Sequence, residues 1–209
     1  MTSSTTFDIH LMTEDDYDQV LSLLLNSFFQ DEPITRCIQL TDTLDFAKSI
    51  IQGCLKDKCS FVACHPQTKQ IAAVCLNEII YKNNNEENIQ WGEKIRFIFE
   101  ILSAVHKKRS IFEEFSADKL LHIYIISVDQ SARGHGLASK LIGKSIEYGK
   151  ELQMIGAYAE ATNLISLKSF KQQKFDVFDE LIYVNYNPQR LAGLKGEIYD
   201  RCYLVARKL

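Results

Sequence analysis

The chain has 209 residues, 46% of them hydrophobic, which is enough to bury the core of one α/β domain. Its formal net charge of −3 excludes the basic footprint of a nucleic-acid-binding protein. No apolar stretch reaches the roughly 18 residues of a membrane span, and the short polar start lacks the basic and apolar regions of a signal peptide. We therefore expect a disordered tail at residues 1–6 and a single domain at residues 7–209, with no membrane or nucleic-acid partner.

The six cysteines form no Cys-x-x-Cys pair, and none of the five histidines has a ligand spacing with a cysteine. Several cysteines lie in apolar patterns, where a free thiol behaves as a small hydrophobic side chain. This usage favours a reduced, cytoplasmic protein and no metal site. The expected assembly is a monomer or a homodimer.

The first half of the chain begins with an edge strand over residues 7–12 and a capping box at Thr13-x-x-Asp16. An amphipathic helix then runs to about Phe29. The run Asp31-Glu32-Pro33-Ile34 is expected to break this helix and open a loop, because a proline excludes helix at its own position and discourages it just before. The later elements predicted here are a helix over 43–56, a hairpin of strands 59–65 and 71–81, a solvated loop over 82–88 and a helix over 91–107.

The second half alternates strand and helix before it ends in a pair of strands. The predicted elements are strand 120–128, helix 137–152, strand 155–161, helix 166–173 and strands 175–185 and 202–208. The connecting segment 187–199 is long for a hairpin loop and could line a site. Alternation in the middle with hairpins at both ends predicts a mixed sheet with helices on both faces.

The segment Arg133-Gly134-His135-Gly136-Leu137-Ala138 lies between a buried strand and an amphipathic helix. A strand, a glycine turn and a helix start together gather unpaired backbone N–H groups around an anion. Gly134 and Gly136 allow positive φ and close approach of a phosphate. We interpret the segment as a pyrophosphate-binding loop; the alternative is an ordinary strand-to-helix turn. Ser139 stands where a dinucleotide fingerprint would have its third glycine, and no Gly-Lys-Ser/Thr follows.

With Val128-Asp129 before it, this segment resembles the acyl-CoA-binding motif of the GNAT N-acetyltransferases. The resemblance implies a single GNAT-type α/β domain with a mixed, mostly antiparallel twisted sheet of about seven strands. It also implies a V-shaped split between two central parallel strands, 120–128 and 155–161, and acetyl-CoA as cosubstrate. The residues it assigns to the cosubstrate are Ile126, Ser127 and Val128 through their backbone, with Arg133, Gly134, His135, Gly136, Leu137, Ala138, Ser139 and Lys168.

Asp31-Glu32-Pro33 is similar to a motif of the insect-type arylalkylamine N-acetyltransferases, a branch of the same superfamily. The resemblance implies that Glu32 is the general base, acting through water, with Asp31 as its competitor. The residues alone favour the alternative, a solvated acidic turn.

Ser166 matches the second of two serines that the same branch uses in proton transfer, and Thr162 stands where the first would be. The alternative is that Thr162 or Asn163 only caps the next helix, with Ser166 in its first turn. Phe170 replaces the tyrosine acid of other superfamily members and has no proton to donate. Lys174 replaces a glycine commonly found there, so the turn into the next strand must change conformation or accept strain.

The expected function is acetyl transfer from acetyl-CoA to a small primary amine, such as dopamine, serotonin or tyramine, by direct attack in a ternary complex. The alternatives are a polyamine acceptor, a protein N-terminus or lysine as acceptor, and a non-catalytic acyl-CoA-binding protein. Most aromatic residues in such patterns are core, so the sequence does not separate an aryl from an aliphatic amine.

Overall fold

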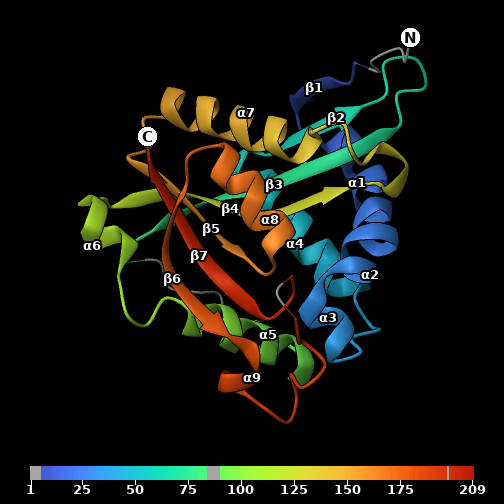
Figure 1. Cartoon of the computed structure of the whole chain (residues 1–209). Coiled ribbons are helices and arrows are strands. Elements are labelled where there is room, and N and C mark those ends of the chain that lie inside the picture. Colours follow the sequence, from blue (N-terminus) through green and yellow to red (C-terminus); the bar gives the residue numbers. More distant parts are fainter. Residues whose placement is uncertain (1–5, 84–89, 197) are drawn as a thin grey trace.

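The computed structural model describes residues 6–83, 90–196 and 198–209. Residues 1–5 of the predicted tail and 84–88 of the predicted loop lie outside these ranges. Within the ranges, the chain forms a seven-stranded sheet in the order β1-β2-β3-β4-β5-β7-β6, flanked by helices (Figure 1). No helix in the described parts of the chain is long and apolar enough to cross a membrane.

The strands are β1 (Asp8–Leu11), β2 (Phe61–Cys64), β3 (Ile71–Tyr81), β4 (Lys119–Val128), β5 (Gly156–Ala161), β6 (Asp176–Ile182) and β7 (Arg201–Lys208). Each neighbouring pair is antiparallel except β4 and β5, which are parallel. This arrangement confirms the predicted mixed, mostly antiparallel sheet with its two central parallel strands.

Helices cover both faces of the sheet, in keeping with the unbroken run of buried residues in β3. On one face, α7 (Leu137–Glu151) and α8 (Leu164–Gln172) pack on Ala73 and Cys75. On the other face, α1 (Tyr17–Leu23) and α4 (Leu44–Asp57) pack on Val74 and Leu76. The helix α5 (Glu93–Ala104) and the short helices α3 (Pro33–Cys37) and α6 (Ile111–Phe115) pack over the start of β4 and over β7.

The two central strands pair over a very short length. Their parallel ladder joins Leu121 to Ala157 and His122 to Tyr158. Beyond these pairs, the remaining residues of β4 continue along β3, while β5 continues along β7. The sheet therefore splits between β4 and β5, and their carboxyl ends diverge.

The first helical run is continuous but irregular. A 3-10 turn (Glu14–Asp16) leads into α1, and a π-helical segment, η2 (Leu24–Phe28), separates α1 from α2 (Phe29–Asp31). π-Helical turns occur mostly as local insertions at functional sites. Here the segment carries Ser27 and Phe28 to the cavity described below. The sequence pattern predicted a plain helix and did not indicate this insertion.

Other predicted elements differ from the structure at their ends. Pro33 does not open a loop: it starts α3, where its fixed φ suits the first helical turn. The predicted helix 91–107 ends at Ala104, and α6 was not predicted. The predicted strand 175–185 ends at Ile182, because α9 (Tyr183–Tyr186) turns the chain and fully buries the ring of Tyr183.

Lys174 has a φ of +60°, so the turn from α8 into β6 keeps the left-handed conformation that a glycine would adopt freely. The strain expected from the sequence at this position is therefore present.

Candidate active site

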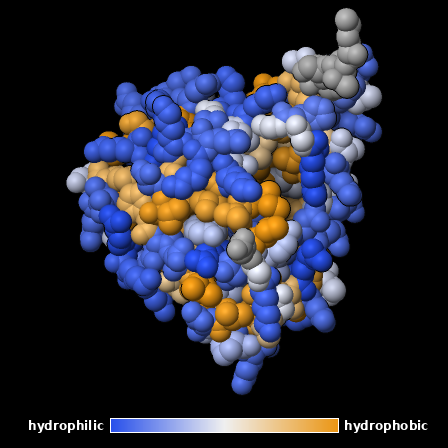
Figure 2. Space-filling view, in the orientation of Figure 1, coloured by the Kyte–Doolittle hydropathy of each residue, from blue (hydrophilic) through white to orange (hydrophobic). Residues whose placement is uncertain are grey.

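A cavity of about 680 Å³ opens where β4 and β5 separate. Its walls come from η2, α2, α3, α4, α5, the two central strands and the start of α7 and α8. Ile165 and Tyr199 line it and are also among the exposed large hydrophobic residues, so part of its opening is apolar. Figure 2 shows hydrophobic side chains in a band across this face of an otherwise largely hydrophilic surface.

The end of β4 presents backbone groups to the cavity. The amide of Asp129 donates to the carbonyl of Ala72 at 2.8 Å, and antiparallel ladders alternate hydrogen-bonded with non-bonded pairs. Ser127 therefore faces β3 with its backbone, whereas Ile126 and Val128 face the split. In agreement with this, the Val128 carbonyl accepts hydrogen bonds from groups outside β3: the Ser27 hydroxyl at 3.3 Å and Arg133 Nε at 3.3 Å. Two backbone N–H groups, those of Ile126 and Val128, are thus aimed where a thioester carbonyl could lie.

The predicted phosphate-binding loop has the backbone that its glycines indicated. Gly134 and Gly136 have φ values of +84° and +69°, and a Cβ built on either would meet nothing within 4 Å. Gly136 is the N-cap of α7, so the free amides at the start of that helix lie behind it. Leu137, Ala138 and Ser139 follow in the first turn and, with Arg133 and both glycines, line the cavity. The loop can receive an anion at close range.

Arg133 does not point freely into the loop. Its Nη2 forms an ion pair with Asp31, and it also contacts the Ser27 hydroxyl at 3.5 Å. Both carboxylate and guanidinium are about half exposed. This pair connects the start of the phosphate loop to the end of the first helical run.

Glu32 lies across the cavity and is only 9% exposed. It is the N-cap of α3: its Oε2 accepts from the Thr35 amide at 2.6 Å and from the Thr35 hydroxyl at 2.8 Å. Its Oε1 is buried and has no hydrogen-bond partner among the described residues. Burying a carboxylate oxygen without a hydrogen-bond partner costs free energy, because the oxygen loses its hydrogen bonds to water and gains none from the protein. The neighbouring Thr35 bonds fix this oxygen in the cavity wall.

Thr162 and Ser166 also line the cavity, at the end of β5 and in the first turn of α8. The cap of α8 is Asn163, whose side chain accepts from the Ser166 amide at 2.8 Å. The Ser166 hydroxyl donates to the Asn163 carbonyl at 2.9 Å, and the Thr162 carbonyl accepts from the Tyr183 hydroxyl at 2.9 Å. Thr162 is thus not the cap, and the cavity holds the hydroxyl side chains of both positions.

Two of the sequence-predicted cosubstrate residues lie elsewhere. His135 lines a second, separate cavity; its ring packs edge-on against Phe7 and contacts the Ala132 carbonyl at 3.1 Å. Lys168 is exposed on α8 and, among the described residues, is outside the cavity lining. The cavity also contains residues that the sequence did not single out for function, including Ser27, Phe46, Phe99, Tyr124 and Glu160. In the sequence, each of them looks like an ordinary residue of a helix or strand, and only the fold brings it to the site.

Comparisons with known proteins agree with this geometry. Residues 109–175 match the model of the Acetyltransferase (GNAT) family. The structure is similar to that of arylalkylamine N-acetyltransferase 2 from Aedes aegypti, with a TM-score of 0.85 and 26% identity over 97% of this chain and 99% of that chain. A polyamine N-acetyltransferase from Drosophila melanogaster that forms N-acetylagmatine has a TM-score of 0.80 and 18% identity over 98% and 100% of the two chains. An Arabidopsis thaliana protein in complex with acetyl-CoA has a TM-score of 0.59 and 14% identity over 98% and 100%.

Residues 109–175, which contain the phosphate-binding loop, match the GNAT family model, and the fold of the whole chain is similar to that of solved acetyltransferases, so both the sequence and the fold resemble the GNAT acetyltransferase family. Insect arylalkylamine N-acetyltransferases are among its structural neighbours. Acetyl-CoA is the acetyl donor of this family.

Proposed function

We propose that the chain transfers the acetyl group of acetyl-CoA to a small primary amine by direct attack, with Glu32 as the general base. The observation that carries the proposal is the buried Oε1 of Glu32, which has no partner in the described part of the chain and lies in the same cavity as the phosphate loop. An amine acceptor must lose a proton, since its ammonium has a pKa of roughly 10 by analogy with lysine. A carboxylate oxygen with free lone pairs can take that proton directly or through one water.

The remaining groups of the cavity suit the other needs of the reaction. The loop from Arg133 to Ser139 and the start of α7 would hold the pyrophosphate of the donor. The N–H groups of Ile126 and Val128 would polarise the thioester carbonyl and stabilise the developing oxyanion. Ser166, with Thr162 beside it, would return a proton to the leaving thiolate. No covalent acetyl-enzyme is required.

Aromatic side chains of the cavity favour an aryl amine as the acceptor. Phe28, Phe46, Phe99 and Tyr124 line the cavity together with Glu32. Aromatic walls with one carboxylate oxygen left unpaired among the described residues suit a flat, apolar body that carries one ammonium group. A long polyamine would bring further ammonium groups into the cavity, and each would need a partner to offset its loss of water.

A panel of acceptors with acetyl-CoA and a thiol-release assay tests the proposal. We expect turnover with dopamine, serotonin or tyramine and a higher kcat/KM for them than for spermidine, agmatine or peptides. A preference for peptides or polyamines would contradict the aryl-amine acceptor. Binding of coenzyme A without turnover of any acceptor would contradict the proposal that the chain is an enzyme.

A further inference from the structure

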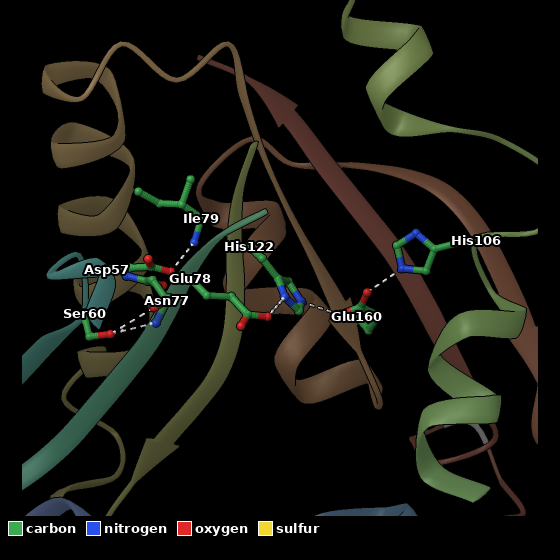
Figure 3. Close-up of polar contacts among 8 residues, drawn as sticks. All are labelled: Asp57, Ser60, Asn77, Glu78, Ile79, His106, His122 and Glu160. Atoms are coloured by element: carbon green, nitrogen blue, oxygen red, sulfur yellow. Dashed lines mark hydrogen bonds and ion pairs between the residues drawn. The ribbon is translucent and has the colours of Figure 1, made fainter. Parts of the chain in front are cut away.

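Four ionisable side chains form a row beneath the cavity. The ring of His122 on β4 lies between two carboxylates: its Nδ1 is 2.7 Å from Glu78 Oε1 on β3, and its Nε2 is 2.7 Å from Glu160 Oε2 on β5. The other oxygen of Glu160 is 2.5 Å from His106 Nε2, just beyond α5. Figure 3 shows these contacts running across three strands to the neighbouring helix.

The geometry favours a doubly protonated His122. An ionised carboxylate only accepts hydrogen bonds, and a neutral imidazole has only one N–H. Each ring nitrogen of His122 faces a carboxylate, so the ring is an imidazolium when both carboxylates are ionised. It stacks on the face of Tyr158 at 4.5 Å between ring centroids, where a cation is favourable.

The charges in the row support this assignment. Burial alone would lower the pKa of His122, but the charge of Glu160 and the hydrogen bonds to Glu160 and Glu78 raise it to about 10. Burial alone would raise the pKa of Glu160, but the charge of His122 and the hydrogen bonds from His106 and His122 hold it well below its usual range. His122 and Glu160 are therefore held as a charged pair near neutral pH. Five titratable groups surround His122: Glu78 on β3, Tyr124 on β4, Tyr158 and Glu160 on β5, and His106 after α5. Two cysteines, Cys54 on α4 and Cys202 on β7, lie close to these groups.

The place of the pair His122–Glu160 in the sheet is informative. His122 and Tyr158 are the last residues paired in the backbone ladder between β4 and β5. Glu160 is two residues further along β5, so its bond to His122 is a side-chain link across the strands where the ladder has ended. Glu160 also lines the cavity. Its strand continues at once to Thr162 and α8, while β4 continues to the amides of Ile126 and Val128.

We propose that His122 is a positioning residue for acetyl transfer: it ties β5 to β4 at the vertex of the split and fixes the carboxylate of Glu160 in the cavity wall. The link sets the distance between the hydroxyl groups carried by β5 and α8 and the backbone amides that receive the thioester carbonyl. This role rests on the proposed function, but it concerns His122 and Glu160, which lie on β4 and β5 and not in the phosphate loop. Loss of the link should therefore change kcat and leave the binding of coenzyme A intact.

The test uses two variants of the link and two controls in the full chain. For His122→Gln and for the near-isosteric Glu160→Gln, we expect kcat to fall roughly tenfold or more, since small misplacements of reacting groups have effects of this size. Their affinity for coenzyme A should stay within about twofold of the wild type, as expected when loop contacts are unchanged. His10→Gln breaks a surface histidine–carboxylate pair with Asp16 and should change neither quantity.

Glu78→Gln separates charge from geometry, because Glu78 holds the same ring but does not line the cavity. It should lower the pKa of His122 without breaking the link to Glu160. Activity of this variant should then fall as the pH rises through the lowered pKa, since the ring loses a proton and with it one of its two hydrogen bonds. The wild type should show no such inflection between neutral pH and pH 9. Nitrogen-15 spectra of the ring should show both nitrogens protonated in the wild type over that range.

A neutral His122 ring at pH 7, or folded His122→Gln and Glu160→Gln proteins with wild-type kcat, would overturn the positioning role alone. A wild type that binds coenzyme A but acetylates no amine would instead overturn the proposed function, and the positioning role with it.

Discussion

At the scale of single residues, Glu32 differs from every other carboxylate of the cavity. Asp31 is paired with Arg133, and both oxygens of Glu160 are bonded to histidines. Only Glu32, among the described residues, holds a buried oxygen without a partner. If Glu32 served only as the N-cap of α3, one carboxylate oxygen would accept from Thr35 and the other would be expected to face solvent.

Glu32→Gln should lower kcat by roughly 10²- to 10⁴-fold, the usual contribution of a general base. The amide oxygen of the glutamine can still accept the two Thr35 bonds, so α3 should stay capped and the protein folded. Coenzyme A affinity, measured by calorimetry, should change little. The matched control is the adjacent Asp31→Asn, whose kcat should stay far closer to that of the wild type. A Glu32→Gln enzyme with wild-type turnover would remove Glu32 from the chemistry.

At the scale of elements, the start of α8 has two roles that the sequence could not separate. Asn163 caps the helix, whereas Thr162 and Ser166 turn hydroxyl-bearing positions toward the cavity. The cap has φ −162° and lies outside the helix, as N-cap residues do.

Asn163→Ala should reduce the free energy of unfolding by about 1 kcal/mol, because it removes the acceptor for the Ser166 amide. Urea denaturation gives the change directly. In Thr162→Ala, the backbone carbonyl that accepts from Tyr183 remains, so stability should change by less than about 0.5 kcal/mol. Equal losses in the two variants would contradict the assignment of the cap.

Sequence patterns predict elements well where one local signal dominates. The apolar strand before Gly134 and the amphipathic helix after Gly136 are found as expected. At Lys174, where the sequence left open a changed conformation or a strained turn, the backbone is left-handed. The short helices α6 and α9 and the π-helical segment η2 were not predicted. Each depends on tertiary burial, as with the ring of Tyr183, rather than on a periodic pattern.

At the scale of the whole molecule, the site depends on sequence-distant contacts. The phosphate loop could be predicted because its glycines and the helix start are adjacent in the chain. The row from Glu78 to His106 could not, because it needs the register of β3, β4 and β5. That register includes a bulge between Leu76 and Asn77, which sets the side of the sheet on which Glu78 meets His122. Residues 32, 126–128, 133, 134, 136–139, 162 and 166 meet in one cavity only because the split sheet brings two halves of the chain together.

Calorimetric titration with coenzyme A tests the central claim most directly, that the phosphate loop and the split sheet form one donor site. The wild type should bind one equivalent, and Gly136→Val should abolish binding by placing a side chain in the open space above the loop. Gly196→Val is the matched control, because its φ of +86° and open surroundings impose the same backbone strain of roughly 1–2 kcal/mol. Retained binding in Gly136→Val, or no heat of binding in the wild type, would contradict the account.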